Sequence, residues 1–209
     1  MKNNTRKLVL LSLLIAIQCV IGYLSIPITS DLSITFNMIP MAVAAIAMGP
    51  SGGLVLGCTF GLISFLQCYS ILGASLQGIA LLELGVSPVL LFLQRFLPRA
   101  LDGLLLGLIF NAIKNKLRLP VSSGITGFLA AFLNTLFFMS ALLLLFSHTS
   151  YMQEKIAGRA YIVYVVTSVG VQGLIELAVS TLATSAIATA LHKAGFIRLE
   201  KDKNREKNT

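Results

Sequence analysis

SPVLLFLQRFLPRALDGLLLGLIF, residues 87–110, is a long apolar run that starts with a helix signal and carries three charged side chains. Serine suits the cap of a helix and proline suits its first turn, so we predict a helix that starts at Pro88 and continues to Ile113. A helix needs about 20 apolar residues to cross the roughly 30 Å hydrocarbon core of a bilayer. This stretch therefore predicts a membrane span, and its buried charges are candidate functional groups.

The composition of the whole chain agrees with this interpretation. The 209 residues are 56% hydrophobic and 11% charged, with a mean hydropathy of +0.87. A soluble domain would carry about a quarter charged residues. We predict an all-α integral membrane protein with room for about six spans and none for a soluble catalytic domain.

Hydropathy divides the chain into six predicted transmembrane helices within one membrane domain, residues 1–192. Their ranges are Leu8–Ser25, Ile34–Met48, Leu54–Leu72, Pro88–Ile113, Ser122–Phe146 and Tyr161–Leu191. Residues 73–86 are less regular, and we expect a long loop with a half-buried turn. The charged tail 193–209 is expected to be disordered. The basic N-terminus resembles the start of a signal peptide, but no A-x-A-like cleavage site follows, so we expect the first span to be retained.

The basic residues predict the orientation. Twelve of the 16 Lys and Arg residues lie before the first span, in the 114–120 loop, or from Lys193 onward. By the positive-inside rule both termini are cytoplasmic, and residues 28–33, 73–86 and 147–160 face outside. The net charge of +8 thus fits a multi-pass protein of the cell membrane beside anionic lipid, and we predict no nucleic-acid partner.

Residues 49–53, GPSGG, have the G-x-S-x-G spacing that can hold a nucleophilic serine. A nucleophile needs a base within hydrogen-bond reach, but His148 falls in an outer loop and His192 at the cytoplasmic end of the last span. Pro and Gly also suit a tight turn between helices. We therefore interpret the motif as a turn, with Ser51 hydrolase chemistry as the weaker alternative, and predict no catalytic residues.

Small residues repeat every fourth position on several spans, which allows helices to approach closely in lipid. Packing within the bundle is the expected role for most of them, whereas a repeat that faces lipid would dock another membrane subunit. The repeats are Gly53/Gly57/Gly61, Gly103/Gly107, Ser12/Ala16 and Ala186/Ala190.

Four ionisable residues fall inside predicted spans. Arg95, Arg99 and Asp102 share one helix face at i, i+4 and i+7, and Glu176 lies on the last span. An Arg99–Asp102 ion pair is one interpretation, but it leaves Arg95 without a carboxylate unless Glu176 reaches it. The alternative is a guanidinium that faces a cavity open to the outside, where its planar fork of donors suits a carboxylate.

Uncharged polar residues cluster at a similar depth toward the outside. Interhelical hydrogen bonding is an equal interpretation for each one alone, but together they predict a small polar pocket entered from the exterior. They are Thr35, Asn37, Gln67, Asn134, Thr135 and Gln172.

Several motifs are absent from the sequence. There is no G-x-x-x-x-G-K-[ST] loop for ATP, and Cys19, Cys58 and Cys68 lack metal-ligand spacing, so we predict no metal site and no cofactor of the chain's own. The absence of tryptophan argues modestly against a large flat ligand.

Across about residues 5–192 the chain resembles the substrate-binding S components of energy-coupling factor (ECF) vitamin transporters. The resemblance rests on SITFNMIPMAVAAIAMGPSGGLVLGCTFGLISFLQC at 33–68, on the 87–110 stretch, and on FLAAFLNTLFFM at 128–139. Within the family the chain looks most like the pantothenate-specific type.

The resemblance implies a six-helix protein that binds a vitamin on the outer side. It implies partners as well: a shared transmembrane subunit and two cytoplasmic ATPases, which use the ATP. In the family the first span docks through an A-x-x-x-A face, which is Ser12-x-x-x-Ala16 here, and the 73–86 segment matches a gating loop.

Joined to the pocket residues, the resemblance predicts a pantothenate importer subunit. Arg95 or Arg99 would bind the carboxylate. The hydroxyl and amide groups would contact Asn134, Gln172 and Glu176, with Asn37 and Gln67 nearer the entrance. The alternatives are the same scaffold for riboflavin, folate or a queuosine-type precursor, and a self-sufficient secondary transporter, although the two halves show no clear repeat.

Overall fold

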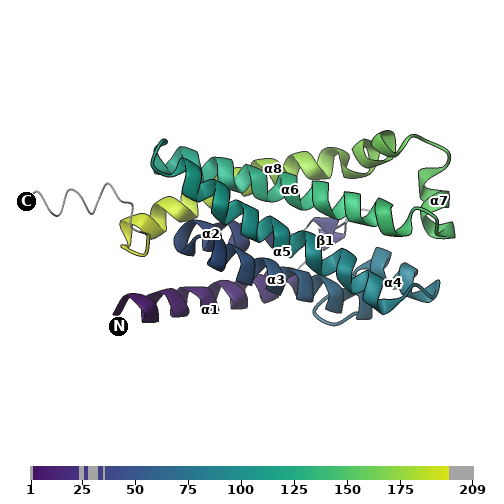
Figure 1. Cartoon of the computed structure of the whole chain (residues 1–209), viewed down its shortest axis with the longest axis horizontal. Coiled ribbons are helices and arrows are strands. Elements are labelled where there is room, and N and C mark those ends of the chain that lie inside the picture. Colours follow the sequence, from purple (N-terminus) through teal and green to yellow (C-terminus); the bar gives the residue numbers. More distant parts are fainter. Residues whose placement is uncertain (1, 24–25, 28–32, 35, 198–209) are drawn as a thin grey trace, which may run out of the picture.

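The protein is a bundle of helices, seen in a computed structural model that describes residues 2–23, 26–27, 33–34 and 36–197 (Figure 1). The elements are α1 (Lys2–Tyr23), β1 (Ile26–Pro27), β2 (Ser33–Ile34), α2 (Met38–Met48), α3 (Pro50–Leu66), the 3₁₀ turn η1 (Gln67–Tyr69), α4 (Leu76–Glu83), α5 (Pro88–Ile113), α6 (Leu119–Phe146), α7 (Ser150–Ile156) and α8 (Tyr161–Lys193).

Among the described residues, five helices are long and apolar enough to cross a membrane, which confirms the predicted class of helical membrane protein. The predicted second span, Ile34–Met48, differs from the structure. Ser33–Ile34 instead pairs antiparallel with Ile26–Pro27, and α2 has only 11 residues, or about 16 Å of helix. α2 lies in the centre of the bundle, where Met38 to Ile46 are buried.

The predicted boundaries hold best where proline marks a helix start. α5 has the predicted ends, and α6 begins three residues before the predicted Ser122, with Pro120 in its first turn. The predicted loop at 73–86 is wrong in one respect, because it contains the helix α4. The Ser75 side chain accepts a hydrogen bond from the Gly78 amide at 3.4 Å and so caps this eight-residue helix.

The glycine repeats of α3 and α5 pack against each other, in accord with the predicted role of packing within the bundle. A Cβ on Gly53 would overlap the carbonyl oxygen of Gly103, and one on Gly103 would overlap that of Gly53. The two backbones therefore touch directly, and no larger residue fits between them.

The GPSGG motif forms the turn between α2 and α3. Gly49 alone separates the two helices, and its φ of 73° and ψ of −155° suit a residue without a Cβ. Pro50 then starts α3, and the Ser51 hydroxyl donates to the Met48 carbonyl at 3.3 Å. The turn interpretation of this motif is confirmed.

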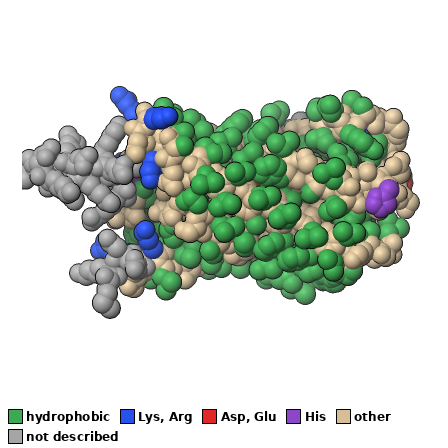
Figure 2. All heavy atoms as spheres, in the orientation of Figure 1, with side chains coloured by type: hydrophobic (Ala, Val, Ile, Leu, Met, Phe, Trp, Pro, Cys, Tyr) green, Lys and Arg blue, Asp and Glu red, His purple; other side chains and the backbone are tan. Residues whose placement is uncertain are grey.

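The two ends of the bundle differ in charge. α1 begins and α8 ends at one end, which we call the basic end, and α4 and α7 lie at the opposite end (Figure 1). Figure 2 shows Lys and Arg side chains gathered at the basic end and hydrophobic side chains over the middle of this face. This distribution is the one that the charge pattern of the sequence predicted.

α8 is broken near the end opposite the basic end. Gly170 has φ 26° and ψ −126°, so the 33-residue helix changes direction there. The part that can span a membrane is Gln172–Lys193. Ile197, past the end of α8, is buried, and its carbonyl oxygen lies 2.9 Å from Nδ1 of His192 in the last turn of the helix. The predicted disordered tail is thus folded back as far as 197, and residues 198–209 lie outside the described part of the chain.

Candidate functional site

A polar cavity of about 100 Å³ lies between α3, α5, α6 and α8, on the side of α4. Its wall consists of Phe60, Ser64, Gln67, Ser75, Gln77, Arg95, Arg99, Asn134, Thr135, Phe138, Met139, Val169, Gln172 and Glu176. The helix faces predicted from sequence meet here: six of the seven predicted binding residues line this one cavity, and Asn37 does not.

Two arginines from consecutive turns of α5 form one wall. Arg95 and Arg99 are 4% and 6% exposed, so both guanidinium groups are inside the protein. Arg95 donates from Nη2 to the side-chain oxygen of Gln77 at 3.2 Å, and Arg99 donates from Nη1 to the Arg95 carbonyl at 2.9 Å. These partners are all neutral, so they orient the two heads without cancelling their charge.

Aromatic rings complete the surroundings of the arginine heads. The Arg99 guanidinium carbon lies 4.6 Å from the centre of the Phe60 ring and 4.7 Å from that of Phe138. Arg95 lies 5.0 Å from the same Phe138 ring. A cation over a ring face gains electrostatic energy where water is excluded, and these rings help to hold the charges inside the membrane.

The Arg99–Asp102 ion pair that the sequence left open is not formed as a hydrogen-bonded pair. Asp102 is fully buried, and neither carboxylate oxygen has a hydrogen-bond partner among the described residues. The Nε atoms of Arg95 and Arg99 also lack a partner within the described part of the chain. Unused donors on two buried cations suit an anionic molecule in the cavity.

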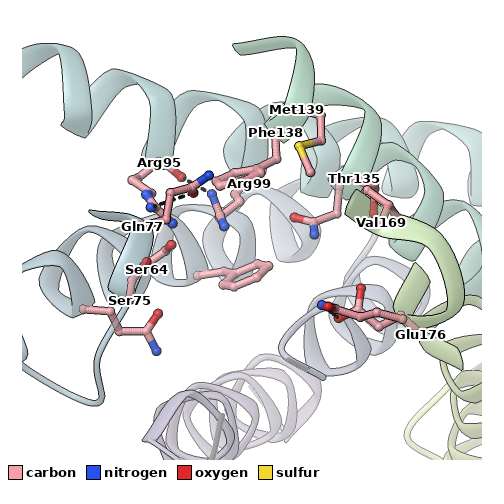
Figure 3. Close-up of a pocket in the computed structure, with 14 residues that line it drawn as sticks. Ser64, Ser75, Gln77, Arg95, Arg99, Thr135, Phe138, Met139, Val169 and Glu176 are labelled. Atoms are coloured by element: carbon pink, nitrogen blue, oxygen red, sulfur yellow. Dashed lines mark hydrogen bonds between the residues drawn. The ribbon is translucent and has the colours of Figure 1, made fainter. Parts of the chain in front are cut away.

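The opposite wall carries oxygen-rich groups from α6 and α8. Glu176 is 7% exposed, and one of its carboxylate oxygens accepts from the Gln172 amide at 3.4 Å. Figure 3 shows Glu176 across the cavity from Arg95, Arg99 and Gln77. The side-chain oxygen of Asn134 is buried and has no partner among the residues described. The cavity is thus cationic at one side and offers hydrogen-bond acceptors at the other.

The two remaining predicted residues are held near the end of α1. The amide nitrogen of Gln67 donates to the carbonyls of Gly22 at 2.8 Å and Leu72 at 3.3 Å, although the residue also lines the cavity. Asn37 is fully buried, and its carbonyl accepts from the Gln18 side chain at 3.0 Å. The structure places Asn37 in the packing between α1 and α2, outside the cavity wall.

Sequence reasoning missed several wall residues, of which Gln77 is the most informative. Its segment was predicted to be a loop because eight residues are too few to show a helical period. The serine at 75, which caps α4, was the available signal. Phe60, Ser64, Phe138, Met139 and Val169 were missed because hydropathy does not tell which face of a span points inward.

The predicted docking residues Ser12 and Ala16 lie on the exposed side of α1. Large apolar residues surround them on this side, among them Leu13 at 56% exposed and Val20 at 59%. In contrast to the glycines of α3 and α5, this pair of small residues is exposed in the part of the chain that the structure describes.

Comparisons with known proteins agree with this arrangement. The family model described as "ECF transporter, substrate-specific component" matches residues 6–188, which include most of each of the five long apolar helices. No curated protein matches the chain.

Proposed function

Because the chain belongs to the family of substrate-specific components of ECF transporters, we propose that it binds pantothenate in the cavity beside Arg95 and Arg99. Proteins of this family are transporter subunits, so the chain is a substrate-binding membrane subunit and not an enzyme. They bind small-molecule vitamins and work with ECF membrane and ATPase modules.

One observation supports the choice of an acid: two buried guanidinium groups face a cavity, and the hydrogen-bond partners they have among the described residues are neutral. A carboxylate is the planar, bidentate partner that guanidinium prefers. Pantothenate carries one carboxylate, with an amide and two hydroxyls further along the molecule. We place the carboxylate at Arg95 and Arg99, and the hydroxyl and amide groups at Asn134, Gln172 and Glu176. Gln67, which also lines the cavity, would lie nearer the entrance.

The proposed orientation puts this cavity toward the outside of the cell membrane. Both termini would then be cytoplasmic, in accord with the basic end of the bundle. In this arrangement α2 accompanies the five long helices as the sixth, central element of one membrane domain, residues 1–192, followed by a cytoplasmic tail, residues 193–209.

The proposed partners are one ECF transmembrane subunit and two cytoplasmic ATPases. The exposed Ser12/Ala16 face of α1 would dock the transmembrane subunit, since small residues let a partner helix approach closely. ATP would be used by the ATPases, and the chain itself would need no cofactor.

Binding without ATP tests the substrate directly. Protein purified in detergent should bind radiolabelled pantothenate saturably, at one site per chain, when no ATPase subunit is present. An absence of binding at micromolar pantothenate would contradict the substrate assignment. Mass spectrometry of small molecules that copurify with the protein would then identify the compound that takes its place, with riboflavin, folate and queuosine-type precursors among the candidates.

A further inference from the structure

The short helix α4 brings a neutral acceptor to one of the two buried arginines. Gln77 is 5% exposed, and its side-chain oxygen accepts a hydrogen bond from Arg95 Nη2 at 3.2 Å. Figure 3 shows the two side chains meeting at the edge of the cavity. Of the wall residues described, Gln77 is the one that α4 contributes to the hydrogen bonding of the arginines.

The position of Gln77 is fixed by packing. Its neighbour Gly78 has no side chain, and a Cβ there would overlap the Cys68 sulfur and come within 3.2 Å of Arg95 Nη2. The Ser75 cap fixes the start of the same helix. α4 therefore packs closely against η1 and the Arg95 guanidinium. The side chain at position 77 determines which hydrogen-bond partner α4 offers to that guanidinium.

A glutamine differs from a glutamate here by charge more than by shape. An amide oxygen orients the guanidinium through one of its five donors and leaves the positive charge uncompensated. A carboxylate in the same place would neutralise Arg95 and replace the anion that the cavity otherwise attracts. Arg95 Nε lacks a partner among the described residues, so a second edge of the guanidinium is still unused.

We infer that Gln77 is a specificity-determining residue, because it orients Arg95 through a hydrogen bond without neutralising the positive charge. The cavity therefore binds a small monocarboxylic acid more tightly than the neutral analogue of that acid. The inference rests on the proposed function for the identity of the acid. It adds that the preference depends on a residue outside the membrane-spanning helices, acting through Arg95.

The test compares two ligands and three substitutions. The ligands are pantothenate and pantothenol, in which a hydroxymethyl group replaces the carboxylate. The wild type should prefer pantothenate by roughly 10- to 100-fold, the range expected for a hydrogen-bonded charged group. Gln77→Glu should remove this preference, mainly by weakening the binding of the acid. Gln77→Met, which deletes the acceptor at similar volume, should weaken acid binding and keep part of the preference.

Gln153→Glu is the matched control, because it adds the same charge to the exposed face of α7. It should keep the wild-type preference. If Gln77→Glu keeps the wild-type preference too, Gln77 does not determine specificity and the inference is overturned.

A second measurement needs no ligand. In the empty protein, Gln77→Glu should raise the midpoint of thermal unfolding in detergent above that of the wild type, because it pairs a buried charge, and Gln77→Met should lower it. If the wild type binds neither compound, the proposed substrate fails, and this measurement still decides the role of Gln77. A midpoint for Gln77→Glu at or below that of Gln77→Met would overturn the inference.

Discussion

The two halves of α5 use the same helix face for opposite purposes. In the half near the basic end, Gly103 and Gly107 bring the backbone of α5 into contact with α3, at Gly53 and Pro50. In the other half, Arg95 and Arg99 extend from the same face and line a cavity. α3 packs closely on α5 in both halves, since Gly57 and Gly61 lie against the α5 backbone at Arg99 and Phe96, but the long charged side chains line a cavity only in the second half.

This difference separates the residues that stabilise the fold from the residues that bind the ligand. Buried cations are expensive in a membrane, and the protein holds them with neutral oxygens and aromatic rings in place of carboxylates. In the glycine half, the backbones of α3 and α5 pack directly against each other. Substitutions in the glycine half should therefore change folding, and substitutions in the arginine half should change ligand binding.

The largest effect is expected from Arg99→Ala. Truncating one partner of a buried, hydrogen-bonded charge pair costs about 2–5 kcal/mol, so pantothenate affinity should fall by more than about 30-fold. Isothermal titration calorimetry on the purified variant measures this change. Arg159→Ala, which removes an arginine between α7 and α8 that bonds to the carbonyl of Ile156, should bind as the wild type does. Full retention of affinity in Arg99→Ala would remove Arg99 from the site.

The next largest effect is expected in the glycine half. Gly103→Ala inserts a methyl group against the Gly53 carbonyl and should destabilise the protein by about 1–3 kcal/mol. Gly124→Ala on α6 is the control, since its nearest atom, Thr181 Cγ2, lies at 3.8 Å and the helix gains up to about 1 kcal/mol of propensity. Thermal unfolding in detergent compares them. Equal midpoints would show that the close contact of α3 and α5 does not limit stability.

A smaller effect is expected from Phe138→Leu. The ring of Phe138 lies under both guanidinium groups, and leucine keeps the apolar volume without the ring face. The loss of cation–π contact, about 0.5–2 kcal/mol, should lower pantothenate affinity roughly 2- to 30-fold. Phe128→Leu, at an exposed position two to three turns earlier on α6, serves as the control in the same titration. Equal affinities for the two variants would mean that the ring does not support the arginine pair.

Sequence alone predicted the features that have a strong local signal. Pro88 after a serine predicted the start of α5, and the four-residue spacing of glycines predicted close packing within the bundle, which the structure shows between α3 and α5. The spacing of Arg95 and Arg99 on one face, with Glu176 on another span, was enough to bring them to one predicted pocket, and the structure places them around one cavity.

The features that the sequence did not predict depend on tertiary contacts, which leave no periodic pattern in the sequence. Gln77 lies on a helix of eight residues, too short to be recognised from its period. The sequence places Asn37 at the same depth as the pocket residues. In the structure Asn37 lies between α1 and α2, where its carbonyl accepts a hydrogen bond from Gln18. The length of α2 was overestimated, because residues 33–34 are apolar enough for a span and yet form a strand.

A structure of the protein with its ligand bound is the most direct test of the role of the two arginines. We expect the carboxylate of the bound molecule within hydrogen-bond distance of Arg95 or Arg99, with its hydroxyl groups toward Glu176. A structure in which Asp102 and Glu176 pair with both arginine heads, and the ligand lies elsewhere, would contradict it.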